Sequence, residues 1–257
     1  MFDILRARFQ QKYQTLSYPD GPSPTLPDRF QGRPVIQPMA CVSSCSACVE
    51  VCPTGAIDIS GQGDHRHVCV DLGRCLFCGA CESACPAGII RFERDHQLAV
   101  SDRQSLVVDR TSEACASVHD GLIQRVFGRS LKLRQVSAGG CNACEADANV
   151  LGTLAWDMGR FGIEFVASPR HADGLLVTGP VTENMREALI KTYEAVPSPK
   201  VVIAVGACAI SGGLFVEHPE VYNGVEGWIP VDLYVPGCPP HPLTLLDGLL
   251  RLLGRID

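Results

Sequence analysis

The sequence predicts two parts, a small cysteine-rich α+β domain followed by an α/β domain built on a parallel sheet. Three observations predict this arrangement. Nine of the 14 cysteines lie between Cys41 and Cys85. Within that stretch, a pattern of cysteine, proline, glycine and isoleucine recurs after 33 residues. From Leu131 onward, strand-like apolar runs alternate with helix-like segments, which is typical of a parallel sheet covered by helices.

The composition excludes several classes of protein. Hydrophobic residues make up 46% of the 257 residues and charged residues 19%, so the chain is not expected to be disordered. The net charge of −6 gives no reason to expect nucleic-acid binding. The uncharged stretch 201–216 is too short and too rich in glycine for a transmembrane helix. We expect no secretory signal, so the cysteines indicate metal or redox chemistry rather than disulfides.

The amino-terminal residues predict a helix and a linker. Phe2, Leu5 and Phe9 recur at helical spacing within residues 2–14, and their apolar face would dock on a partner, on this chain or on a membrane surface. Five prolines between residues 19 and 34 then predict an extended segment. The predicted division is therefore a helix and linker at 1–35, the repeat-containing domain at 36–105, a connector at 106–130 and the α/β domain at 131–257.

The second copy of the repeat has the cysteine spacing of two-cluster bacterial ferredoxins. It reads Cys75-x2-Cys78-x2-Cys81-x3-Cys85-Pro86, and in such runs the fourth cysteine ligates the other cluster. Three thiolates on one tight turn can converge on a single cubane, while small residues between them let backbone amides approach its sulfurs. This crossed pattern predicts that one [4Fe–4S] cluster is ligated by Cys75, Cys78, Cys81 and Cys52.

The first copy differs from the second at its first cysteine. It reads Cys41-x3-Cys45-x2-Cys48-x3-Cys52-Pro53, so Cys41 stands one residue ahead of the repeat. A one-residue bulge could still bring it to a cluster; the alternative is a three-iron or labile cluster with Cys41 free. Structural zinc usually uses two separated cysteine pairs, which disfavours a zinc site. The predicted ligands of the other [4Fe–4S] cluster are Cys41, Cys45, Cys48 and Cys85.

The α/β part contains four more candidate ligands, each group directly after a predicted strand. The strands are expected at 131–136, 163–167, 174–178, 201–205 and 231–235, and the helices at 120–127, 143–158, 183–195 and 242–253. Strand ends share one edge of an open parallel sheet, where ligands bind. The residues Cys141, Cys144, Cys208 and Cys238 can therefore meet and hold a third [4Fe–4S] cluster, with zinc or unpaired thiols as the alternatives.

Longer motifs surround these cysteines. Those of the α/β part are Phe127-Gly-Arg-Ser-Leu131, Gly139-Gly-Cys-Asn-Ala-Cys-Glu145, Ser168-Pro-Arg-His-Ala-Asp173, Thr178-Gly-Pro-Val-Thr182, Gly206-Ala-Cys208 and Val235-Pro-Gly-Cys-Pro-Pro240. With these motifs, this part resembles the small subunit of formate hydrogenlyase and hydrogenase-4, which are energy-converting [NiFe] hydrogenases. This small-subunit family is related to the 20 kDa subunit of NADH:quinone oxidoreductase. With Ser17-Tyr-Pro19, Phe30-Gln-Gly-Arg-Pro34 and both cysteine runs, the amino-terminal part resembles the two-cluster ferredoxin subunit of the same complexes.

The resemblance implies a fusion of two adjacent subunits, with a flavodoxin-like second domain. Its cluster would be nearest the catalytic site of a partner [NiFe]-hydrogenase-like large subunit, so this chain would transfer electrons without binding nickel. Further partners would be membrane subunits and a donor or acceptor of the ferredoxin or formate dehydrogenase type. The complex would lie on the cytoplasmic face of the inner membrane.

Two rival functions remain at this point. One is a subunit of a nickel-free NADH:quinone-oxidoreductase-like complex with quinone as acceptor. That family has two adjacent cysteines where this chain has Cys141-x2-Cys144, the hydrogenase arrangement. The other rival is a stand-alone ferredoxin-like carrier or iron–sulfur scaffold.

Several other residues have alternative roles. Glu145 is a candidate proton relay or a helix cap. Arg170 and His171 would tune the third cluster, face a partner or form a structural salt bridge. Cys69 and Cys115 are expected to be buried free thiols. Asp232 and Asp247 are expected to be surface charges.

Overall fold

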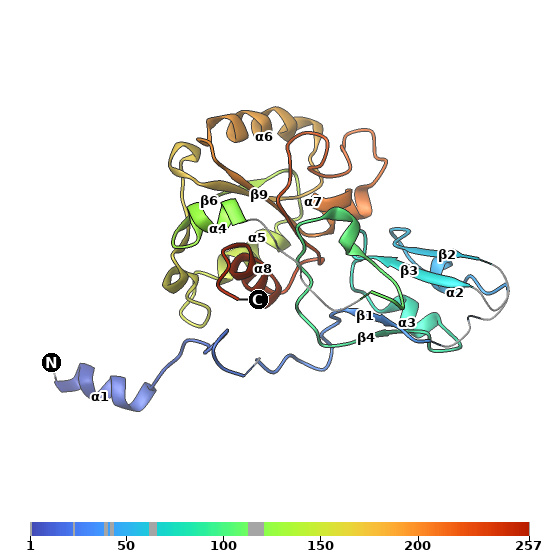
Figure 1. Ribbon diagram of the computed structural model, residues 1–257, viewed down its shortest axis with the longest axis horizontal. Helices are drawn as coiled ribbons and strands as arrows, with labels where there is room; N and C mark the ends of the chain where they lie inside the picture. The colour runs from blue at the N-terminus through green and yellow to red at the C-terminus, as the bar shows by residue number, and fades with distance from the viewer. Residues whose placement is uncertain are drawn as a thin grey trace.

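The computed structural model describes residues 2–22, 24–38, 41, 44–61, 66–112 and 121–256. It contains an α/β domain and a smaller domain beside it, and helix α1 (Phe2–Gln11) extends away from both (Figure 1). Cys115 lies outside the described residues, so its expected burial is not addressed.

The α/β domain contains a five-stranded parallel sheet, as predicted. The strand order is β10-β9-β8-β6-β7. The bounds are β6 (Leu131–Ser137), β7 (Ile163–Phe165), β8 (Gly174–Thr178), β9 (Val201–Val205) and β10 (Leu233–Val235). Alternate side chains of β8 enter two different cores, Leu175 and Val177 on one face and Leu176 on the other. The central strands β8 and β9 are buried on both faces, which explains why nearly all of their residues are apolar.

Helices cover the two faces of this sheet. One face packs against α6 (Glu183–Ala195) and α7 (Ala207–Ser211), the other against α4 (Gly121–Phe127), α5 (Ala143–Val150) and α8 (Pro242–Leu252) (Figure 1). The helix predicted at 143–158 is shorter than expected. It ends at Val150 because Gly152 and the left-handed residue Asp157, with φ 45°, lead the chain into a turn.

The smaller domain contains two equivalent units, as the repeat predicts. In the first, α2 (Ala47–Glu50) precedes β2 (Ile57–Ser60); in the second, α3 (Ala80–Ala84) precedes β4 (Ile90–Phe92). The repeated isoleucines Ile57 and Ile90 each begin a strand. β2 pairs with β3 (His67–Asp71) and β4 with β1 (Pro34–Ile36), both antiparallel. β5 (Val107–Val108) joins β3, within the segment predicted as a connector.

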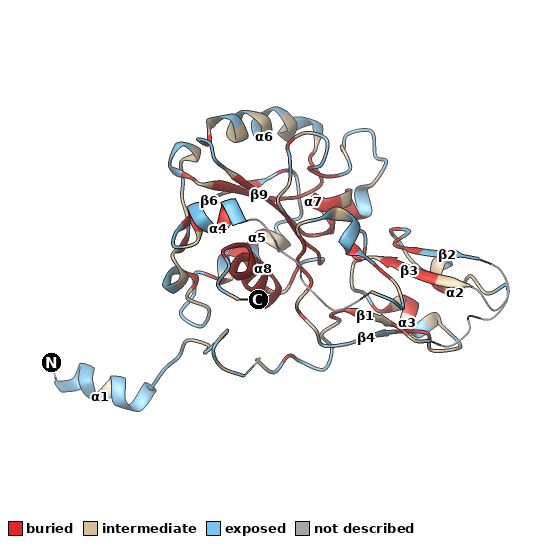
Figure 2. Ribbon diagram, viewed as in Figure 1, coloured by how far each residue is buried: buried red, intermediate tan, exposed pale blue. Residues whose placement is uncertain are grey.

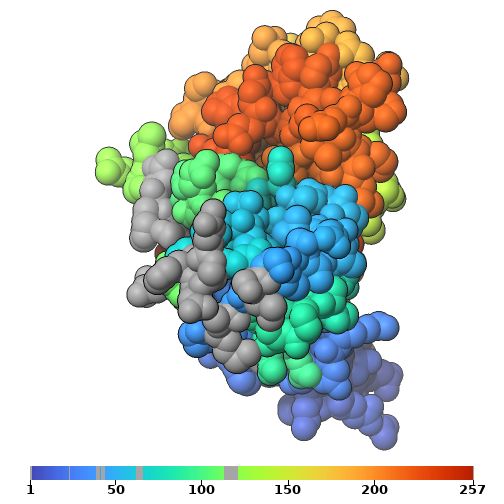
Figure 3. Space-filling view, turned by 90° about the vertical axis from the view of Figure 1, so that its right-hand side faces the viewer, coloured from blue at the N-terminus to red at the C-terminus, as the bar shows by residue number. Residues whose placement is uncertain are grey.

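The two domains join at the edge of the parallel sheet. Val100 and Tyr234 of edge strand β10 form an antiparallel bridge, with N···O distances of 3.0 and 2.8 Å. Next to it, Ala99 is fully buried against α8, where a Cβ added to Gly248 would lie 2.6 Å from the Ala99 Cβ. Figure 3, viewed from the side of the smaller domain, shows its residues in direct contact with the orange segment of the α/β domain.

Helix α8 carries an ion pair that the sequence did not indicate. Asp247, expected at the surface, is fully buried, and Figure 2 shows α8 as a buried helix. The Tyr18 hydroxyl donates to Asp247, and the Arg251 Nε lies 2.9 Å from it. The expectation was wrong because the amino-terminal segment covers the side of α8 that faces away from the sheet. Asp232 is half-buried rather than exposed, and its carboxylate accepts from the Val202 N–H at 2.7 Å.

Helix α1 has no buried residue. Its apolar side chains are exposed, including Phe2 at 83% and Phe9 at 82%, so the helix does not dock on the described part of this chain. No described helix is both long and apolar enough to cross a membrane.

Candidate iron–sulfur sites

The first set of cysteines comprises Cys41, Cys45, Cys48 and Cys85. Cys48 is buried on α2, and the other three are half-buried. Burial, followed by the nearby thiols of Cys85 and Cys41, raises the pKa of Cys48. Despite its shifted position, Cys41 thus lies close enough to Cys48 to act on it. The Cys85 Sγ also accepts a backbone hydrogen bond from Ile89 at 3.3 Å.

The second set comprises Cys52, Cys75, Cys78 and Cys81, which line one cavity together with apolar side chains such as Ile57 and Val70. Cys52 comes from the first run and the other three from the second, as the crossed pattern predicts. Burial raises the pKa of Cys75 to about 12 and that of Cys81 to about 11, and the thiol of Cys52 adds to both shifts.

Backbone amides point at the sulfurs of the second set. The N–H groups of Ala56 and Phe77 donate to the Sγ atoms of Cys52 and Cys75, each at 3.3 Å. Such amide donors stabilise negative charge on sulfur, which is the arrangement that a cluster requires. Thiols in an apolar cavity with inward amides are therefore a chemically suitable donor set for iron and sulfide.

The third set lies at the carboxyl edge of the parallel sheet. Cys141 and Cys144 follow β6, Cys208 lies on α7 after β9, and Cys238 follows β10. Burial raises the pKa of Cys208 to about 11, with further raising by Cys238 and Cys141. Burial also raises the pKa of Cys144, and Cys208 is the next largest cause. Thiols from three separate parts of the sequence therefore lie near enough to influence one another at this edge.

Two glycines make room for the third set. A Cβ on Gly206 would lie 2.6 Å from the Cys144 Sγ, and one on Gly213 would lie 2.8 Å from the Cys208 Sγ. Both glycines also have positive φ, at 88° and 57°. No side chain other than hydrogen fits these positions while the sulfurs stay where they are. Among the described residues, no three cysteine, histidine or carboxylate groups converge on a single metal ion.

Glu145 lies beside the third set and is 6% exposed. It accepts a hydrogen bond from the Thr178 hydroxyl at 2.6 Å, which links α5 to the end of β8. Burial raises the pKa of Glu145, but hydrogen bonds from Ser137 and Thr178 outweigh this, so that its pKa is lowered overall. The carboxylate is thus held in its ionised form.

The remaining candidates lie apart from the cysteine sets. Arg170 and His171 are exposed in a 3-10 turn, and neither forms an ion pair within the described part of the chain. Cys69, expected to be buried, is only half-buried, because it lies on β3 in the three-stranded sheet of the smaller domain, opposite Asp58 of β2 in the strand register.

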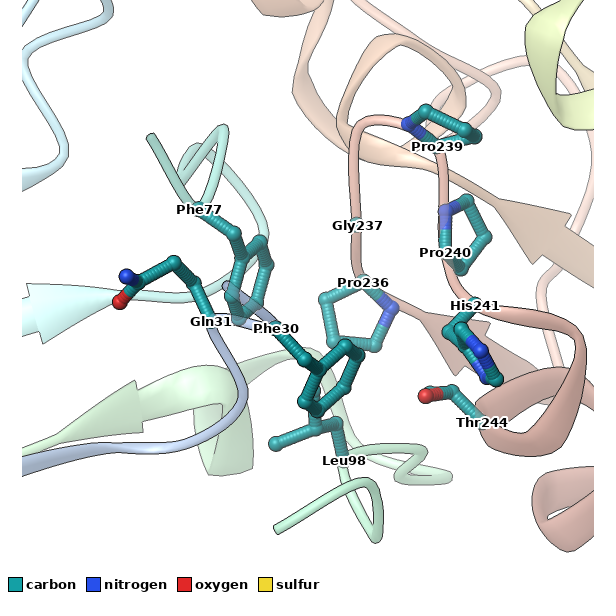
Figure 4. A pocket seen from close by; sticks show the side chains of 10 residues that line it. All are labelled: Phe30, Gln31, Phe77, Leu98, Pro236, Gly237, Pro239, Pro240, His241 and Thr244. Carbon is teal, nitrogen blue, oxygen red and sulfur yellow. The ribbon is translucent and has the colours of Figure 1, made fainter. Parts of the chain in front are cut away.

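The second and third sets are neighbours across the domain boundary. Burial raises the pKa of Cys238, and Cys141 and then Cys78 add to the shift, so thiols of the two domains interact. A cavity beside them is lined by Phe77 of the second run, Phe30, and the 236–241 loop (Figure 4). Sequence reasoning named Phe30 only as part of a resemblance motif and did not single out Phe77, because no cysteine pattern shows which loops of two domains meet.

Two family models match the chain. The model described as "NADH ubiquinone oxidoreductase, 20 Kd subunit" matches residues 141–252. The model described as "4Fe-4S dicluster domain" matches residues 28–89. The matched ranges contain the third set and the first two sets respectively.

Several curated proteins are similar to this chain. A probable membrane-bound hydrogenase subunit of Pyrococcus furiosus is 44% identical over 132 residues, 51% of this chain and 79% of that protein. Formate hydrogenlyase subunit 7 of Escherichia coli is 40% identical over 161 residues, 62% of this chain and 63% of that protein. An NADH-quinone oxidoreductase subunit of Clostridium beijerinckii is 46% identical over 118 residues, 46% of this chain and 70% of that protein.

Proposed function

The chain belongs to the family of the 20 kDa subunit of NADH:ubiquinone oxidoreductase and carries a 4Fe–4S dicluster domain in front of it, and from this premise we propose that it is the electron-transfer subunit of a membrane-associated hydrogenase complex of the formate hydrogenlyase type. The observation that carries the proposal is the presence of three cysteine sets in one chain, with Cys238 of the third set beside the loop that contains Cys78 of the second. The reaction of the complex takes place on a partner chain.

The dicluster domain indicates two iron–sulfur clusters, and we assign them to the first and second cysteine sets. We assign a third [4Fe–4S] cluster to Cys141, Cys144, Cys208 and Cys238. When bound, such clusters accept and release single electrons. The chain's own residues supply thiolate ligands, aim backbone N–H groups at sulfur, and exclude water with apolar side chains such as Ile57 and Val70.

The partners follow from the chemistry and from the relatives. A large subunit carrying a [NiFe] site would exchange electrons with the third set, whose Cys141 and Cys238 are exposed and available to a partner surface. Membrane subunits and a ferredoxin or formate dehydrogenase-type donor or acceptor would complete the complex. Its expected location is the cytoplasmic face of the inner membrane.

For Glu145 we propose either of two roles, a proton relay at the interface with that partner or a structural residue. Its low pKa keeps it charged, so a relay role would require its pKa to rise when the cluster is reduced. Its hydrogen bond to Thr178 equally supports a structural role in holding α5 to the sheet.

The spacing Cys141-x2-Cys144 favours hydrogenase over a quinone reductase, because it separates the two cysteines that the quinone reductase family has side by side. The test is to purify the complex from its own cells and assay hydrogen uptake with a viologen dye. Uptake, together with a partner that carries two Cys-x2-Cys pairs, is the expected result. If the partner lacks those pairs and the complex takes up no hydrogen, the complex is of the nickel-free, quinone-reducing kind.

A further inference from the structure

Gln31 lies between the second and third cysteine sets. The aliphatic part of its side chain lines the domain-boundary cavity together with Phe77 and Gly237. Figure 4 shows its amide group directed away from Pro236 and His241. The amide instead packs on the second cysteine run. Its Cδ and Nε2 atoms lie 3.5 Å from the position that a Cβ on Gly79 would occupy.

Gly79 connects this amide to the second set. It directly follows Cys78, precedes α3 with a φ of +71°, and lines the cavity of the second set. Because Gly79 has no side chain, nothing from that residue separates the Gln31 amide from the cysteine loop. The amide is therefore positioned next to the loop that presents Cys78 toward Cys238.

The Oε1 atom of Gln31 is buried and has no hydrogen-bond partner among the described residues. Buried polar groups nearly always have one, so this atom indicates a partner supplied by the bound cofactor or by water. If the amide group rotates by half a turn, its oxygen and its NH2 group exchange places. An iron–sulfur cluster offers sulfur acceptors and no donors, so the NH2 is the end that would face it.

We propose that Gln31 donates an amide hydrogen bond to a sulfur of the second cluster and so raises the midpoint potential of that cluster. This inference rests on the proposed function, which assigns the cluster to Cys52, Cys75, Cys78 and Cys81. Reduction adds one negative charge to the cluster, and a hydrogen-bond donor stabilises the more negative state. The cluster tuned in this way is the one beside the third set.

The test is an EPR-monitored redox titration of the reconstituted full chain. Gln31→Met keeps the length of the side chain and removes both N–H donors, while Gln31→Glu replaces the donors with a carboxylate. For Gln31→Met, we expect the ratio of reduced to oxidised second cluster to fall about tenfold at a given applied potential. For a one-electron couple, this corresponds to a midpoint potential lower by about 59 mV. The Gln31→Glu variant should shift further in the same direction, and the first cluster should not shift in either variant.

Gln124→Met is the matched control, because Gln124 is a half-buried glutamine on α4 that packs against Gly254 and lines neither the cavity of the second set nor the domain-boundary cavity. A second-cluster potential that is the same in both Gln31 variants as in this control would overturn the inference. Iron content separates this result from failure of the proposed function. A wild-type chain without a second cluster refutes the ligand assignment and the inference with it, whereas a full complement of iron with an unshifted potential refutes the inference alone.

Discussion

Gly248→Ala tests how the two domains are held together. Gly248 lies in the interior of α8, where glycine is less favourable than alanine by about 1 kcal/mol, so propensity alone predicts that the substitution stabilises the protein. The structure predicts the opposite. The new methyl group would lie 2.6 Å from the Ala99 Cβ, a separation that side chains do not tolerate. Neither carbon belongs to a flexible side chain, so the backbone must move.

The expected magnitude is the difference between these two effects. Overpacking a well-packed core typically costs about 1–3 kcal/mol, which leaves a net destabilisation of up to about 2 kcal/mol after the propensity gain. For a chain of this size, each kcal/mol lowers the midpoint of thermal unfolding by about 2–4 °C. The assay is therefore a thermal unfolding scan of the cluster-loaded protein, followed by circular dichroism.

Two further variants isolate the contact. Gly121→Ala on α4 adds a methyl group where no packing atom of the described residues lies within 4 Å, so it should not lower the midpoint. Ala99→Gly removes the opposing methyl group, so combining it with Gly248→Ala should recover at least about 0.5 kcal/mol relative to the sum of the single effects. A Gly248→Ala protein that unfolds 2 °C or more above the wild type would refute the close approach of the domains.

Four other predictions concern the cysteine sets and the buried polar groups. Cys238→Ala should remove the EPR signal of the third cluster alone and lower the iron content from about twelve to about eight per chain. Cys41→Ala should disrupt the first cluster; two intact four-iron clusters in the dicluster domain of that variant would show that Cys41 is not a ligand. Tyr18→Phe leaves the buried Asp247 without its hydroxyl donor and should cost about 1.5–3 kcal/mol in urea unfolding, whereas an unchanged midpoint would contradict the buried hydrogen bond. Burial lowers the pKa of His96, so unfolding takes up a proton and stability should fall as the pH drops below the unfolded value of 6.5; His96→Phe should flatten this acid limb of a stability–pH curve, and an unchanged slope would show that another group causes it.

Much of the fold was predictable because it depends on short-range patterns. Strands β8 and β9 are apolar runs followed directly by glycine, and α6 begins and ends at its predicted residues. The 33-residue repeat correctly indicated that Ile57 and Ile90 occupy equivalent places, because two similar sequences form similar units. The helix that ends at Val150 was predicted too long, because its apolar residues continue past the turn at Gly152.

The composition of the cysteine sets was also largely visible in the sequence. Spacing within a run limits which thiols can reach one cubane, and the crossed pattern associates Cys52 with the second run; the structure brings these four thiols to one cavity. Strand order then predicts that Cys208 and Cys238 meet Cys141 and Cys144, since parallel strands end at the same edge. Whether each thiol binds iron stays a prediction that metal analysis decides.

The sequence by itself determined the elements, the repeat and the candidate ligands, because periodicity and cysteine spacing act over a few turns of chain. Only the tertiary structure decided which surfaces of the two domains meet. Val100 pairs with Tyr234, Asp247 is buried under the amino-terminal segment, and Cys78 lies near Cys238. These approaches depend on the fit of whole faces packed against each other, for which no local pattern exists. The relation between the second and third cysteine sets is therefore a property of packing rather than of any motif.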